Sequence, residues 1–150
     1  PISEFCRPIR QALKTLPRGV RVIAEPGRFI AGPSGTSVAT VVGRAQREGR
    51  WWYYLDDGLY GSYNGQLYDH ARYPIDVPRR RGPTHPSVLA GPTCDSIDVV
   101  REDIPLPELQ IGDLVVGRMM GAYTACSATD FNFIPRAKIV ALNATARLRP

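Results

Sequence analysis

The sequence predicts a mainly β protein, a β-barrel or sandwich, preceded by a short α/β piece. Two observations predict the β part: 14 glycines and 14 prolines are spread along 150 residues without a period, and short β-rich runs lie between them. A third predicts the α/β piece, because a helical pattern at the start leads directly into a buried-strand pattern. We place the boundary near residue 40, with the end of an α/β barrel at residues 1–40 and a β domain at residues 41–150.

The first 28 residues carry the α/β pattern. Apolar residues between Ile2 and Leu16 recur at helical spacing, with Ser3 as the expected N-cap. Residues 19–24 then predict a buried strand, and Glu25-Pro26-Gly27-Arg28 places a carboxylate and a guanidinium at its C-terminal end. Helix, strand and polar residues at that end form a unit of an α/β barrel, whose active sites lie on this face. An ordinary strand-ending turn has the same signature.

The remaining residues predict short strands and turns. Residues 37–42 and 51–55 predict two strands joined by a hairpin turn, and residues 59–67 a short helix or compact loop. Further strands are predicted within residues 73–79, 88–90, 111–116 and 137–142, with a Pro-rich connection at residues 105–109.

The chain is organised around the stretch Gly91-Pro92-Thr93-Cys94-Asp95-Ser96-Ile97-Asp98. Gly91 and Pro92 end one apolar run and Ile97 begins another, so Cys94 and Asp95 are expected on a turn between two strands. Such a loop is where a rigid scaffold presents chemistry. Taken alone, the octapeptide favours a structural interpretation, in which the thiol is a small buried hydrophobe and Asp95 a turn former.

Composition excludes several classes of protein. Three cysteines without metal-ligand spacing argue against a disulfide framework or a metal site and favour a reducing, cytoplasmic location. No apolar run reaches the roughly 18 residues of a membrane span. The net charge is +5, but the sole basic run, Arg79 to Arg81, is expected to be a solvated loop, and we predict no nucleic-acid partner.

Five short motifs in this order resemble the C-terminal part of the pyridoxal-phosphate-dependent ornithine and lysine decarboxylases. That family joins an alanine-racemase-like TIM-type barrel, which binds the cofactor, to a C-terminal β domain. The resemblance runs over residues 2–142, and its five motifs are specific because they occur in register. They are Glu25-Pro-Gly-Arg28, Asp57-Gly-Leu-Tyr-Gly-Ser-Tyr-Asn64, Tyr68-Asp69-His70, Gly91-Pro-Thr-Cys94-Asp95-Ser-Ile-Asp98 and Gly121-Ala-Tyr-Thr124.

The resemblance implies a set of cofactor contacts to pyridoxal 5'-phosphate. Glu25 would pair with the pyridine nitrogen, which keeps the ring protonated as an electron acceptor. Arg28 and the backbone beside Gly27 would hold the phosphate, and Tyr123 would donate a further hydrogen bond.

It also implies the substrate contacts. Asp69 and Asp95 would bind the distal ammonium of a small diamino acid, and Tyr60 would orient this acidic pair. Cys94 would return a proton to the α-carbon as general acid, and Phe131 would line the pocket. The family builds its sites across a head-to-tail dimer.

In such a dimer, Cys94, Asp95 and Phe131 would serve the neighbouring site. Glu25, Arg28, Asp69 and Tyr123 would serve their own.

The sequence departs from the family in two ways. Phe133 replaces the glycine of the usual Phe-Asn-Gly-Phe segment, which alters the pocket rim or the dimer contact. The Schiff-base lysine and the glycine-rich phosphate loop are missing, and neither Lys14 nor Lys138 stands in a matching context. We therefore expect the chain alone to be inactive. An N-terminal half carrying the lysine, in the same or a separate polypeptide, would complete it as a fragment or a split enzyme.

Two alternatives stay open from the sequence. One is a noncatalytic regulatory homologue that binds a partner through the same dimer surface. The other is a decarboxylase of another amino acid, of the diaminopimelate or arginine type.

Overall fold

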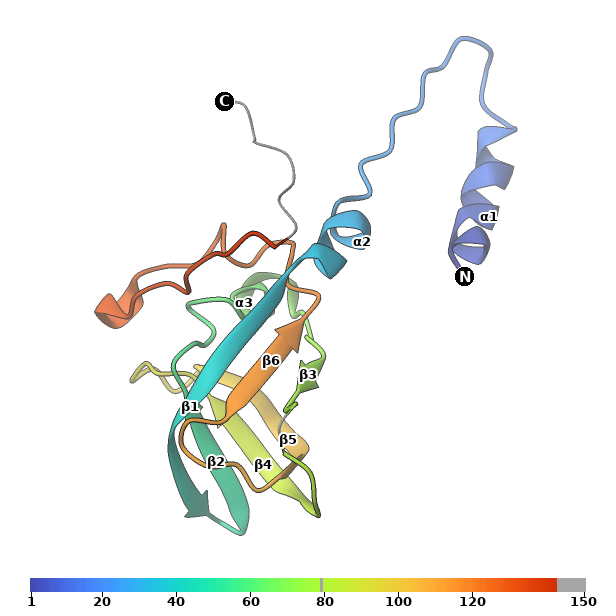
Figure 1. Ribbon diagram of the computed structural model, residues 1–150. Coiled ribbons are helices and arrows are strands. Elements are labelled where there is room, and N and C mark those ends of the chain that lie inside the picture. The colour runs from blue at the N-terminus through green and yellow to red at the C-terminus, as the bar shows by residue number, and fades with distance from the viewer. Residues whose placement is uncertain (79, 143–150) are drawn as a thin grey trace.

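The computed structural model describes residues 1–78 and 80–142 and is mainly β, as expected. Its six strands form one sheet in the order β3-β6-β1-β2-β4-β5, curled into a half-barrel (Figure 1). The strands are β1 (Thr36–Arg47), β2 (Arg50–Leu55), β3 (Ile75–Asp76), β4 (Thr84–Ala90), β5 (Val99–Pro107) and β6 (Leu114–Arg118).

The long strand β1 is central and pairs antiparallel with both β2 and β6. The β1–β2 hairpin turns at Glu48 and Gly49, whose φ angles of 50° and 76° are both left-handed, as the favoured two-residue hairpin turn requires. β2 pairs parallel with β4, and β4 pairs antiparallel with β5. The stretch around Cys94 forms the connection between β4 and the edge strand β5.

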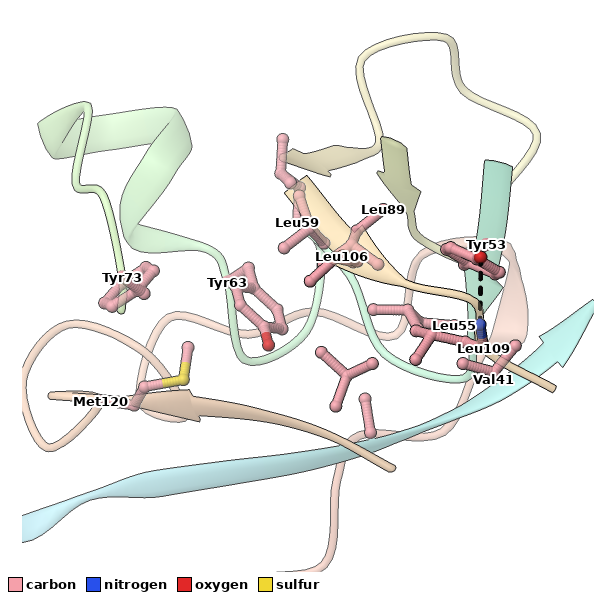
Figure 2. Close-up of a cluster of buried hydrophobic side chains, with 13 residues drawn as sticks. Val41, Tyr53, Leu55, Leu59, Tyr63, Tyr73, Leu89, Leu106, Leu109 and Met120 are labelled. Atoms are coloured by element: carbon pink, nitrogen blue, oxygen red, sulfur yellow. Dashed lines mark hydrogen bonds between the residues drawn. The ribbon is translucent and has the colours of Figure 1, made fainter. Parts of the chain in front are cut away.

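A core of apolar side chains fills the concave side of this sheet (Figure 2). Strand β2 contributes Tyr53 and Leu55, both fully buried, as alternation along a half-buried strand predicts. The Tyr53 hydroxyl accepts a hydrogen bond of 3.1 Å from the Leu109 amide, so the tyrosine is buried with its polar end satisfied (Figure 2). Leu59, after β2, and Leu109, after β5, belong to this core, which therefore anchors both of these loops.

The helices are short apart from the first. They are α1 (Ile2–Leu13), α2 (Gly27–Ala31), α3 (Gly65–Asp69) and the 3-10 turns η1 (Gly32–Ser34) and η2 (Phe131–Phe133). Helix α1 buries none of its residues, and Figure 1 shows it apart from the sheet, joined by an extended segment. No helix in the described part of the chain is long and apolar enough to cross a membrane.

Several predicted elements are wrong in detail. Residues 19–24 are not a strand, and Val20, Val22 and Ile23 are more than half exposed, because no described strand lies beside them to complete a ladder. Residues 137–142 are irregular for the same reason. Ser3 lies inside α1, which begins after Pro1 without a side-chain cap.

Two strands also include prolines at positions where no strand was predicted. Strand β4 contains Pro86, although the predicted strand begins at residue 88, and β5 runs to Pro107, inside the predicted Pro-rich connection. Pro86 lies opposite Pro105, so the two residues that lack an amide hydrogen share one position of the β4–β5 ladder. Together they interrupt the hydrogen bonds of the ladder at a single place, which the sheet tolerates. Residue 40 lies inside β1, and the division into domains stays a prediction.

Candidate active site

Two buried carboxylates fold the loops that carry the predicted site residues. Asp57 is 7% exposed and accepts hydrogen bonds from the Gly58 and Ser62 amides, both at 2.9 Å, and from the Ser37 hydroxyl at 3.1 Å. These bonds hold residues 59–64 as a compact loop, one of the two predicted forms, because the backbone donors turn inward to the carboxylate. The helix α3 starts only at Gly65, so Tyr60 lies in the loop and not on a helix.

Asp98 joins this loop to the Cys94 turn. It is 2% exposed, and one carboxylate oxygen accepts from the Leu59 amide at 2.7 Å. The other accepts from the amide and the hydroxyl of Thr93, at 3.0 and 2.7 Å. A Cβ at Gly58 or Gly91 would collide with this carboxylate, so both positions need glycine. Asp98 therefore sets how the loop after β2 and the loop after β4 meet.

Where these two loops meet, Tyr60 donates a hydrogen bond of 2.5 Å to Asp95. This bond raises the pKa of Tyr60 to about 12, and burial and the negative charge of Asp95 act in the same direction. The same bond lowers the pKa of Asp95, helped by the Ile97 amide and opposed by desolvation. The pair is thus a neutral phenol and an ionised carboxylate at neutral pH, which suits a cationic ligand.

Cys94, beside this pair, is exposed and not in a disulfide. The Asn132 side-chain oxygen lies 3.4 Å from its amide and 3.5 Å from its thiol, and accepts a hydrogen bond from each. Phe131 stacks on Tyr60 with ring centroids 4.3 Å apart and an interplanar angle of 26°. The structure thus brings Tyr60, Cys94, Asp95 and Phe131 together, and we call them, with Asn132, the thiol cluster.

A second group, the cationic cluster, consists of Gly27, Arg28, Asp69 and Tyr123. Arg28 donates a hydrogen bond of 2.5 Å to Asp69, and its guanidinium lies 5.2 Å from the centre of the Tyr123 ring. A Cβ at Gly27 would lie 3.7 Å from the Tyr123 hydroxyl oxygen. A guanidinium and a phenolic hydroxyl side by side can both donate hydrogen bonds to a phosphate group, so the chemistry of these residues suits a phosphate.

Glu25 is exposed and makes no side-chain hydrogen bond among the described residues; its carbonyl accepts from the Gly27 amide at 2.9 Å. The two clusters lie apart: Figure 1 shows η2, which carries Phe131, projecting to one side, away from α2, which carries Arg28. Within the part of the chain that the structure describes, the thiol cluster and the cationic cluster are therefore two separate groups of side chains. Sequence reasoning missed the contribution of Asn132, as well as the anchoring of the loops by Asp57 and Asp98. An Asp before Gly at a strand end was the available signal for Asp57.

The family model described as "Pyridoxal-dependent decarboxylase, C-terminal sheet domain" matches residues 28–121, and the chain belongs to this family.

Within this family, the chain is similar to lysine/ornithine decarboxylases and to an arginine decarboxylase. The chain is 45% identical over 131 residues to the lysine/ornithine decarboxylase of Selenomonas ruminantium, covering 87% of this chain and 33% of that protein. It is 60% identical to the lysine/ornithine decarboxylase of Vibrio vulnificus solved with cadaverine, with a TM-score of 0.89, covering 95% of this chain and 39% of that one. An arginine decarboxylase of Paramecium bursaria Chlorella virus solved with agmatine gives 34% identity and a TM-score of 0.77, covering 84% and 35%. The chain thus spans about a third of the length of the relatives it matches.

Proposed function

We propose that this chain supplies two half-sites of a pyridoxal-phosphate-dependent decarboxylase of lysine and ornithine. The observation that carries the proposal is that each cluster holds one carboxylate, Asp69 or Asp95, beside a group suited to the cofactor or the reacting carbon. Two carboxylates facing each other across a subunit boundary would select an amino acid with a cationic end. The relatives solved with cadaverine and putrescine, the amines of lysine and ornithine, support this substrate class.

On the cofactor side, Arg28 and Tyr123 would hold the phosphate, with Gly27 leaving room beside it. Glu25 would pair with the ring nitrogen. The cofactor, when bound, supplies an electron sink for the bond broken as carbon dioxide leaves.

The ion pair between Arg28 and Asp69 would couple phosphate binding to substrate binding. When a phosphate binds the guanidinium of Arg28, the ion pair with Asp69 is weakened, and the Asp69 carboxylate can then accept a hydrogen bond from the substrate ammonium.

On the substrate side, Tyr60 keeps Asp95 ionised and in place through the hydrogen bond that lowers its pKa. Cys94 gives its proton to the α-carbon: the S–H bond breaks, a C–H bond forms, and the electron pair of the S–H bond stays on sulfur until water returns a proton. Phe131, which stacks on Tyr60, would form an apolar wall along which the carbon chain of the substrate lies.

The rest of the protein would cover what this chain leaves exposed. Phe5 and Ile9 on helix α1, and Ile23 in the extended segment, are 78%, 58% and 68% exposed. We propose that an N-terminal half, with the Schiff-base lysine, packs on these residues, and that two copies assemble head to tail. In that dimer the thiol cluster serves the neighbouring site, and the chain alone is inactive.

The experiment measures carbon dioxide released by the complete protein from lysine, ornithine, arginine and diaminopimelate. We expect release from lysine and ornithine, with the matching diamine as product. Cys94→Ala should lower the rate by about 10²-fold or more, the usual contribution of a general acid. Cys126→Ala is the matched control, since Cys126 is also an exposed free thiol. Absence of carbon dioxide from all four would overturn the proposal, and release from arginine or diaminopimelate alone would overturn the substrate assignment.

A further inference from the structure

The three-residue turn η2 contacts two other members of the thiol cluster, Tyr60 and Cys94. Phe131 at its start stacks on Tyr60, which in turn donates to Asp95. Asn132 at its centre accepts hydrogen bonds from the amide and the thiol of Cys94. A turn 38 residues further along the chain thus contacts the thiol directly and is connected to the carboxylate through Tyr60.

The backbone of the turn shows why Asn stands at this position. Asn132 has φ 55° and ψ 20°, in the left-handed region that Asn adopts more readily than other residues with a side chain. In this conformation its side-chain oxygen reaches across to Cys94. Phe133, also left-handed at φ 59°, is 97% exposed and has no hydrogen bond to Cys94.

A thiol is a weak donor on a freely rotating bond, so its proton has no fixed direction unless an acceptor holds it. Among the described residues, the Asn132 oxygen is the one acceptor that hydrogen-bonds the thiol of Cys94. The same oxygen also accepts from the amide of Cys94, so backbone and side chain are fixed relative to one point.

We infer that Asn132 is a positioning residue, which holds the thiol of Cys94 in the direction from which it delivers its proton. This rests on the proposed role of Cys94 as proton donor. In this role Asn132 acts through the thiol, by the hydrogen bond that its side-chain oxygen accepts. The proton then reaches one face of the α-carbon, and the amine product made in heavy water carries deuterium in a single configuration.

The test uses this chain within the complete protein and compares two matched variants of one turn. Asn132→Gly removes the acceptor without strain, because glycine accepts a left-handed φ. Phe133→Gly introduces the same residue at the next left-handed position, without a contact to Cys94. Asn132→Asp keeps an oxygen acceptor and serves as the rescue variant.

The first measurement is the rate at which iodoacetamide alkylates Cys94, relative to Cys126 in the same sample, by peptide mass spectrometry at one pH. We expect Asn132→Gly to raise this ratio about threefold or more, as loss of one hydrogen bond predicts. Phe133→Gly should leave it unchanged, and Asn132→Asp should keep it at or below the parent value. An unchanged ratio in Asn132→Gly, or an equal rise in Phe133→Gly, would overturn the inference.

The second measurement is the configuration of deuterium in the diamine made in heavy water. We expect a single configuration from the parent and from Phe133→Gly, and a mixture from Asn132→Gly. A single configuration from Asn132→Gly would overturn the role in proton delivery. If the alkylation ratio changes as expected while the parent releases no carbon dioxide, the positioning of the thiol stands and the proposed function fails.

Discussion

Asp98→Asn is the perturbation that tests most directly how the thiol cluster is built. The carboxylate has three donors at 2.7, 3.0 and 2.7 Å in a site that is 2% exposed. An amide has only one oxygen, so whichever way Asn turns, its NH₂ group faces at least one of these donors. Losing a buried hydrogen bond to a charged acceptor costs roughly 1.5–3 kcal/mol. We therefore expect the two loops to open more easily by about 2 kcal/mol.

The assay is hydrogen–deuterium exchange of the complete protein, read from peptides that contain the amides of Leu59 and Thr93. A cost of about 2 kcal/mol corresponds to roughly 30-fold faster exchange if local opening governs it. Asp103→Asn is the matched control, because Asp103 is an exposed carboxylate at φ 50°, paired only with Arg50 among the described residues. Thr93→Val removes one of the three bonds and should give an intermediate effect. Unchanged exchange in Asp98→Asn, or the same change in Asp103→Asn, would refute the reasoning.

Three further predictions concern binding and pH. Tyr60→Phe removes the hydrogen bond that lowers the Asp95 pKa, so the acid limb of kcat/KM should move to higher pH; an unmoved limb in the pH–rate profile contradicts the pairing. Because the pKa of Asp95 is lowered in the folded state, the same bond also stabilises the fold at pH values above about 3.9, the ordinary pKa of an aspartate. This stabilisation is lost as the pH falls through the lowered pKa, so acid unfolding of Tyr60→Phe should lack it. Arg28→Gln should weaken cofactor retention by about tenfold in a fluorescence titration, whereas Asp69→Asn should mainly raise KM for lysine; equal effects of both on both quantities would contradict their separate roles.

The sequence predicted the class of fold better than the bounds of the individual elements. The β1–β2 hairpin followed from local chemistry, since a turn with Gly49 between two β-rich runs leaves little choice. The grouping of Arg28 with Asp69, 41 residues apart, followed only from the family resemblance, because no local pattern encodes a long-range ion pair.

The failures have a common physical cause. Residues 19–24 have the composition of a strand, yet a strand needs a neighbour for its backbone groups, and composition does not report whether one is present. Asp98 and Asn132 escaped notice because a polar residue in a loop looks solvated in sequence. Only the folded chain shows that Asp98 is buried beneath the turn and that Asn132 reaches the thiol.

The central claim, that one chain contributes to two different sites, is tested by mixing two inactive variants of the complete protein. One carries Arg28→Gln with Asp69→Asn, which disables the cationic cluster, and the other carries Cys94→Ala, which disables the thiol cluster. If the clusters serve different sites in a dimer, exchange of subunits creates one intact site and decarboxylation of lysine returns on mixing. If both clusters belong to one site within a chain, the mixture stays as inactive as its components, and the account is contradicted.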